Sequence, residues 1–91
     1  MMDTIKIKIT GRVQGVFFRQ GAQEEATKLG IKGTVENCED DSVEIIATGT
    51  KEQLGKLVEW CRLGPPRAEV ADVTTQELSL QQFRNFSIIR F

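Results

Sequence analysis

The sequence predicts an α/β protein of the α+β kind, a two-layer sandwich in which two helices cover one face of a sheet. Three observations lead to this prediction. Apolar side chains alternate with polar ones in several short segments, as in strands with one buried face. Two longer segments carry apolar side chains at helical spacing. The segments follow one another as strand, helix, strand, strand, helix, strand, strand, so two βαβ-type units share one sheet.

The first half of the pattern begins with a strand over Thr4–Thr10, where Ile residues alternate with Lys. A helix is expected over Arg19–Leu29, and Gly30 is placed to end it in a left-handed conformation. Two short strands are expected next, at Ile31–Asn37 and Val43–Thr48. A polar turn joins them.

The second helix begins after Thr50, and Gln53 lies at the spacing of a capping box. Its apolar stripe consists of Leu54, Leu57, Val58 and Cys61. Gly64-Pro65-Pro66 ends this helix, because proline cannot continue one.

Two further strands complete the pattern, one around Val70 and Val73 and one at Phe86–Phe91. This order is that of a ferredoxin-like βαββαβ sandwich with an additional C-terminal strand and a mixed sheet. Ile and Val side chains, with Trp60 and some of the Phe residues, are expected to fill the layer between sheet and helices. We interpret residues 1–91 as a single domain.

Composition and charge argue against several classes of protein. The formal net charge of -1 provides no overall attraction to nucleic acid or anionic membranes. No apolar run approaches the roughly 20 residues of a membrane-spanning helix. Because no export signal is recognisable, we expect a cytoplasmic location with reduced thiols at Cys38 and Cys61. A monomer is the default expectation for the oligomeric state. Two cysteines without histidine are too few for a structural zinc site.

The segment Gly11–Arg19, GRVQGVFFR, connects the first strand to the first helix. Glycines in such a turn let backbone N–H groups converge, and the helix N-terminus adds partial positive charge. Arg19 adds a planar cationic fork that suits phosphate oxygens. A phosphocysteine loop would need a thiol where Val13 stands, and no Lys-Ser or Lys-Thr follows the glycines. The loop predicts a phosphate cradle without its own nucleophile.

This segment resembles the first motif of the acylphosphatase family, Gly-x-Val-Gln-Gly-Val-x-(Phe/Met)-Arg, at every fixed position. The family's second motif is matched at Gly33, Val35, Asn37 and Val43. Three positions depart from it, since Thr34 replaces an aromatic residue, Glu36 a usually basic one and Asp41 a turn glycine. The resemblance covers the element order of essentially the whole chain.

The resemblance implies that Arg19 and Asn37 are catalytic: Arg19 binds the substrate phosphate and Asn37 positions the attacking water. It also implies that backbone amides surround the phosphate, from Gln14, Gly15, Val16, Phe17, Phe18 and Arg19. The implied activity is hydrolysis of acyl phosphates to carboxylate and inorganic phosphate, which is also the expected inhibitor. Neither a metal nor a cofactor is expected.

This chemistry can proceed without histidine, which the chain lacks. An acyl phosphate has a carboxylate leaving group with a pKa near ~4, which departs without a general acid at neutral pH. A loose phosphoryl-transfer transition state requires mainly positioning and charge stabilisation. Direct attack by water is therefore expected, with poor activity on phosphate monoesters, whose alkoxide leaving groups need protonation.

Two alternatives stay open at this point. The departures in the second motif allow a catalytically weak, anion-binding regulatory domain of the same fold. Sheets of this kind also bind RNA, but through aromatic side chains on the central strands, and here the first and third strands carry none. Phe17 and Phe18 are expected to pack rather than to stack on bases. The carboxylates of Glu39–Asp41 are expected to be solvated rather than to bind a cation.

Overall fold

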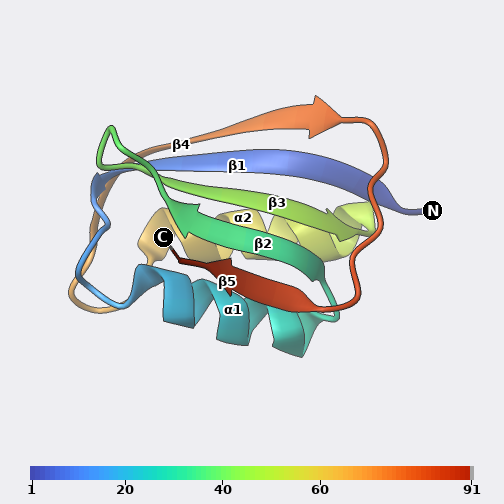
Figure 1. Cartoon of the computed structure of the whole chain (residues 1–91), viewed down its shortest axis with the longest axis horizontal. Coiled ribbons are helices and arrows are strands. Elements are labelled where there is room, and N and C mark those ends of the chain that lie inside the picture. The colour runs from blue at the N-terminus through green and yellow to red at the C-terminus, as the bar shows by residue number, and fades with distance from the viewer. Residues whose placement is uncertain (91) are drawn as a thin grey trace.

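The helices and strands follow one another in the order that the sequence predicts (Figure 1). The computed structural model describes residues 1–90. Its elements are β1 (Asp3–Arg12), α1 (Phe18–Leu29), β2 (Lys32–Asn37), β3 (Val43–Gly49), α2 (Lys51–Leu63), β4 (Glu69–Leu78) and β5 (Phe86–Ile89). The last strand is shorter than expected, because it ends at Ile89. Phe91, the predicted end of this strand, lies outside the described residues.

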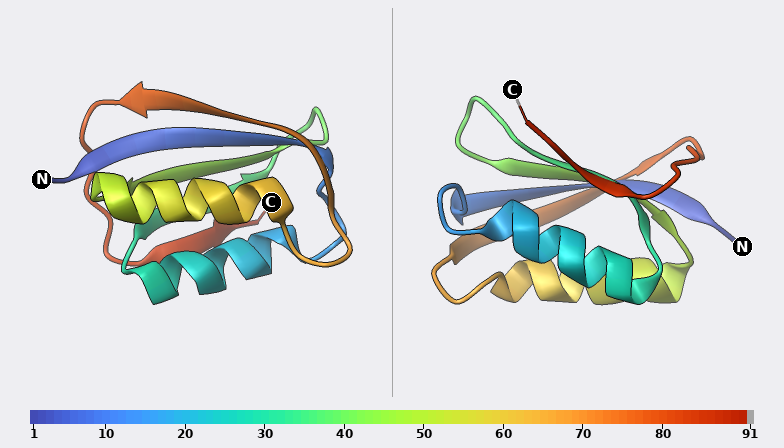
Figure 2. Two further views of the ribbon diagram at one scale, coloured as in Figure 1. Left: turned by 180° about the vertical axis from the view of Figure 1, so that it is seen from behind. Right: turned by 60° about the horizontal axis from the view of Figure 1, so that its bottom comes forward.

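The sheet is mixed, and its strand order is β4-β1-β3-β2-β5. β1 is antiparallel to β3 and β4, and β2 is antiparallel to β3 but parallel to β5. Both helices lie on the same face of this sheet (Figure 2). The two-layer ferredoxin-like prediction is confirmed, with β5 added at the edge beside β2. No helix within residues 1–90 is long and apolar enough to cross a membrane.

The predicted periodicities decide which side chains enter the core. Ile7 and Ile9 of β1 are fully buried, whereas Lys6 and Lys8, which alternate with them, are partly exposed on the other face. The predicted capping box of α2 is present, and the side chain of Gln53 also donates a 2.9 Å hydrogen bond to the carbonyl oxygen of Leu29. The start of α2 is therefore tied to the end of α1.

The aromatic side chains divide between the core and the surface. Phe18 is 1% exposed and packs edge-to-face on Trp60, with a centroid separation of 5.3 Å. Phe17 is 63% exposed, so the expectation that it is a packing residue, like Phe18, is wrong. The reason is its left-handed backbone conformation, with φ of 67°, at the residue where the loop turns into α1.

Three chain segments meet at one end of the molecule: the loop between β1 and α1, the turn between β2 and β3, and the end of β5 (Figures 1 and 2). Near this end, the pairing of β1 with β4 shifts register between Thr10 and Gly11. Gly11 has φ of 120°, and a Cβ there would lie 2.3 Å from the carbonyl oxygen of Glu69. Glycine is thus required at position 11, near the end of β1, by the close contact with β4.

Candidate active site

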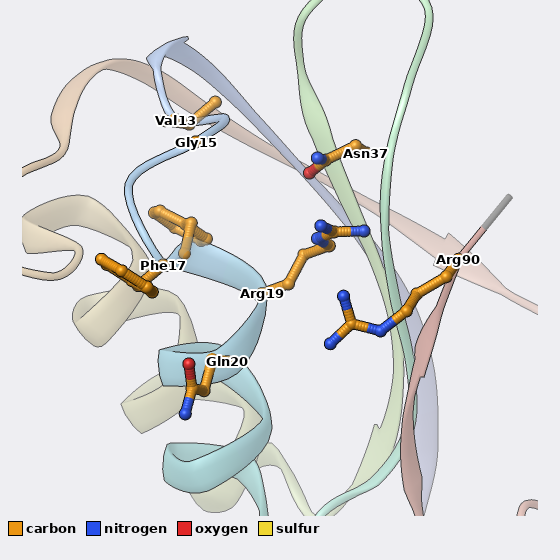
Figure 3. A pocket seen from close by; sticks show the side chains of 8 residues that line it. Val13, Gly15, Phe17, Arg19, Gln20, Asn37 and Arg90 are labelled. Atoms are coloured by element: carbon orange, nitrogen blue, oxygen red, sulfur yellow. The ribbon is translucent and has the colours of Figure 1, made fainter.

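A pocket of about 300 Å³ lies where the loop before α1 faces the ends of β2 and β5 (Figure 3). It brings together five of the predicted site residues: Gly15, Phe17, Phe18, Arg19 and Asn37. Three residues that the sequence analysis missed also line it: Val13, Gln20 and Arg90. The pocket combines residues from the loop, α1, β2 and the end of β5.

The loop turns sharply before it enters α1. Gly15 and Phe17 both have left-handed conformations, with φ of 74° and 67°. Such alternation directs successive backbone N–H groups toward one side and creates an anion-binding concavity. A bulky residue in this conformation is strained by about 1–2 kcal/mol. The strain at Phe17 lies at the pocket, as is common at ligand-binding sites.

The first turn of α1 is open to an anion. Phe17 occupies the N-cap position and provides no side-chain hydrogen bond, and the first turn contains no acidic residue. Phe18, Arg19 and Gln20 of this turn all line the pocket. The free N–H groups of a helix N-terminus and its dipole favour negative charge at this point.

Two other predicted phosphate-binding residues lie outside the pocket lining. Val16 is 5% exposed and belongs to the core. The Gln14 side chain faces the β2–β3 turn, where its Nε2 group donates 2.9 Å hydrogen bonds to the carbonyl oxygens of Cys38 and Ser42. Any contribution of these two residues to phosphate binding is therefore through their backbone.

Asn37 is the last residue of β2, and its side chain points into the pocket toward Arg19 (Figure 3). Its Oδ1 atom is buried and has no hydrogen-bond partner within residues 1–90. An unsatisfied buried acceptor destabilises a protein by about 1–3 kcal/mol. Such an atom beside an anion pocket is suited to accept a hydrogen bond from a water molecule or a ligand.

Two guanidinium groups enter the pocket, from Arg19 and Arg90 (Figure 3). Neither takes part in an ion pair in the described part of the chain. Arg90 reaches the pocket because β5 runs parallel to β2 with Ile89 opposite Glu36, which sets Arg90 beside Asn37. Sequence reasoning missed it, since only the strand pairing reveals this position.

The β2–β3 turn, which follows Asn37, is stabilised by the carboxylate of one of its residues, Asp40. Asp40 accepts hydrogen bonds from the Ser42 hydroxyl and, at 2.9 Å, from Lys8 Nζ. These bonds hold the pKa of Asp40 well below its usual range. Asp41, which replaces the turn glycine of the motif, has φ of 71° and so occupies a left-handed turn position. Across residues 1–90, no three His, Cys, Asp or Glu side chains are grouped to hold a metal ion.

The fold and the pocket define a class of protein: an α+β sandwich with a pocket suited to a small anion, formed by a loop, a helix N-terminus and two arginines. A family model described as acylphosphatase matches residues 5–88. An acylphosphatase of Acaryochloris marina is 45% identical over 86 residues, which cover 94% of this chain and 92% of that protein.

Solved structures agree with this assignment. The crystal structure of acylphosphatase from Bacillus subtilis superposes with a TM-score of 0.93 at 40% identity, covering 99% of this chain and 100% of that chain. An acylphosphatase structure from Coxiella burnetii gives 0.93 at 33% identity, covering 97% and 93%. The chain belongs to the acylphosphatase family, which identifies it as an acyl phosphate hydrolase. This assignment is favoured over the alternative of a regulatory domain.

Proposed function

We propose that this protein hydrolyses acyl phosphates by direct attack of water on phosphorus, with Arg19 and Asn37 as catalytic residues and without a metal. The phosphoryl group lies in the pocket, where the Arg19 guanidinium binds two of its oxygens in a bidentate manner. Backbone N–H groups of Gln14–Arg19 bind the remaining oxygens. Arg90 adds a second positive charge at the pocket.

Asn37 orients the nucleophile. Its Oδ1 accepts a hydrogen bond from water and so directs the water lone pair toward phosphorus. The new bond forms between the water oxygen and phosphorus, and the bond between phosphorus and the carboxyl oxygen breaks with its electron pair. An amide is too weak a base to take the water proton, so a phosphate oxygen receives it. The carboxylate leaves as an anion without a general acid.

The observation that carries this proposal is the buried, unpartnered Oδ1 of Asn37 in the same pocket as Arg19. A water-positioning group needs a free acceptor, and a phosphate-binding group needs a free cation. The proposal also includes residues 1–91 as one domain, a monomeric state, inhibition by inorganic phosphate and a cytoplasmic location.

The test is hydrolysis of benzoyl phosphate, with inorganic phosphate as a competitive inhibitor. Arg19→Ala is expected to lose both activity and phosphate affinity, because the bidentate contact disappears. Asn37→Ala is expected to lose kcat by about 100-fold or more while the inhibition constant for phosphate changes little. Arg62→Ala and Asn85→Ala remove the same kinds of side chain outside the pocket and serve as controls.

Three results contradict the proposal. Unchanged turnover in Asn37→Ala removes the water-positioning role. Loss of wild-type activity with a chelator contradicts metal-independent hydrolysis. Efficient hydrolysis of glycerol phosphate, an alkyl monoester, contradicts the argument that the leaving group needs no acid.

A further inference from the structure

A second hollow of about 700 Å³ adjoins the phosphate pocket, and Arg19 and Asn37 line both. We call its remaining lining the acyl groove; it consists of Glu36, Cys38, Glu39, Glu44 and Ile89. The two shared residues flank the phosphoryl group in the proposed reaction. A substituent on that group therefore has space to extend from the phosphate pocket into the acyl groove.

The register of the sheet explains how one strand serves both hollows. Neighbouring side chains in a strand point to opposite faces, so Asn37 and Glu36 are directed to different sides of β2. Glu36 lies opposite Glu44 of β3 and opposite Ile89 of β5. Since both helices cover the other face (Figure 2), the acyl groove extends over the sheet face that no helix covers.

Arg19 lies where the two hollows meet and binds the phosphoryl group in the proposed reaction, and the charged residues in the rest of the acyl groove are all acidic. Glu44 has a cationic neighbour, Lys6 Nζ, at 3.9 Å. Glu36 and Glu39 take part in no ion pair within residues 1–90, and the nearby Lys8 is bound to Asp40. Glu36 is half-buried, so its charge is less well screened than that of a fully exposed carboxylate.

Glu36 is one of the three positions at which the sequence departs from the second motif that it otherwise resembles. The second acylphosphatase motif usually has a basic residue at this position, and a basic side chain here gives the groove a cation in place of a carboxylate. Compared with the usual motif, this chain therefore has a negative instead of a positive charge in the groove at position 36 of β2.

We propose that the acyl groove holds the acyl group of the substrate, and that Glu36 makes it select acyl groups without negative charge. The expected order of preference is cationic, then neutral, then anionic. The reason is Coulombic: a charge on the acyl group meets unneutralised carboxylates of the groove. The inference rests on the proposed function and specifies its substrate class as acyl phosphates with a neutral or ammonium-bearing acyl group.

The test compares three benzoyl phosphates that carry 4-aminomethyl, 4-methyl or 4-carboxymethyl groups. The methylene separates the charge from the ring, so the three carboxylate leaving groups have similar pKa values. The readout is the ratio of kcat/KM between the cationic and anionic substrates. A change in phosphate binding alters kcat/KM equally for both substrates, so it does not change this ratio.

For the wild type, this ratio is expected to be about fivefold to tenfold at low salt and to shrink at high salt. Glu36→Gln, which keeps the shape of the side chain, is expected to lower it by about threefold, and Glu36→Lys to reverse the preference. Glu77→Gln makes the same change in net charge on β4, at the opposite edge of the sheet. This control is expected to leave the ratio unchanged.

The outcomes separate this inference from the proposed function. A ratio near one in the wild type, unchanged in the Glu36 variants, overturns the role of the groove while acyl phosphate hydrolysis stands. Equal effects of Glu36→Gln and Glu77→Gln also overturn it, because the effect then comes from net charge alone. If none of the three substrates is hydrolysed, the proposed function itself fails.

Discussion

The Nε2 group of Gln14 donates a 2.9 Å hydrogen bond to the carbonyl oxygen of Cys38, the residue directly after Asn37. The same group donates a second bond of 2.9 Å to the carbonyl oxygen of Ser42. One side chain of the loop thus holds both sides of the β2–β3 turn. The position of Asn37 is therefore coupled to the loop that precedes Arg19.

Replacement of Gln14 by Ala tests this coupling. The loss of two hydrogen bonds is expected to lower the free energy of unfolding by about 1–3 kcal/mol. Because Asn37 and the loop then shift relative to each other, kcat for benzoyl phosphate is expected to fall by about tenfold or more. Urea unfolding and steady-state kinetics measure the two effects.

A matched control exists on α1. The Gln23 side chain donates a 3.0 Å hydrogen bond to the carbonyl oxygen of Phe86, away from the pocket. Gln23→Ala is expected to lower stability without a comparable fall in kcat. If both variants lose stability and both retain full turnover, the Gln14 contact is only structural.

The order of elements could be predicted from the sequence because β1 and both helices have clear periodicity. β4 was harder to predict, since it runs over Glu69–Leu78 and Val73 is its only buried residue. An edge strand that pairs only with β1 needs few apolar side chains, so alternation there is weak. Its length is decided by the hydrogen bonds of the neighbouring strand rather than by its own sequence.

Some residues of the candidate site could be predicted from the sequence and others could not. Arg19 and Asn37 are predicted from the resemblance of two local motifs, of which the second is matched only in part, and the structure brings both residues into one pocket. Arg90 has no motif around it. Its position depends on the parallel pairing of β5 with β2, a contact between segments far apart in the chain. The side-chain bonds of Gln14 are missed for the same reason, because the residues that accept them lie across the fold.

Arg90 provides a second prediction. Its guanidinium lines the phosphate pocket but is exposed to solvent, so its attraction for an anion is moderate. Arg90→Gln is expected to raise the inhibition constant for inorganic phosphate by about threefold to tenfold at low salt. The difference should diminish as salt increases, because exposed charges are screened.

Competitive inhibition at two salt concentrations measures this effect. Arg84→Gln serves as the control, since Arg84 is also exposed and precedes β5 without lining the phosphate pocket. Equal inhibition constants in the wild type and Arg90→Gln contradict a contribution of Arg90 to anion binding.

Two glycines inside helices are expected to respond differently to replacement by alanine. A Cβ on Gly55 of α2 meets no atom within 4 Å, so Gly55→Ala should stabilise the protein by about 1 kcal/mol through helix propensity. A Cβ on Gly21 of α1 would lie 2.9 Å from Cζ2 of Trp60. There the same gain in propensity is opposed by displacement of the indole from Phe18.

Thermal and urea unfolding of the two variants provide the comparison. Gly21→Ala should be less stable than Gly55→Ala, and the near-ultraviolet signal of Trp60 should change only in Gly21→Ala. An equal gain in stability for both substitutions contradicts the tight contact between α1 and Trp60.

The last prediction concerns the pH dependence of stability. Burial in α2 raises the pKa of Cys61 to about 12, whereas a thiol in an unfolded chain titrates near about 8.5. Between these values the unfolded chain releases a proton that the folded chain retains. The unfolded state is therefore favoured as the pH rises, and the free energy of unfolding decreases over this window. Below it, the thiol is protonated in both states and contributes no pH dependence.

Cys61→Ala removes the contribution of this thiol to the pH dependence of stability. Comparison with the parent protein therefore separates it from the effect of lysine side chains, which titrate in the same pH range. Near neutral pH the variant should be less stable than its parent by about 1 kcal/mol, because it buries less apolar surface. That difference should shrink as the pH rises above about 9. Urea unfolding at several pH values, in a Cys38→Ala background with reductant, measures it. A constant difference across the alkaline range contradicts the burial of a neutral thiol at this position.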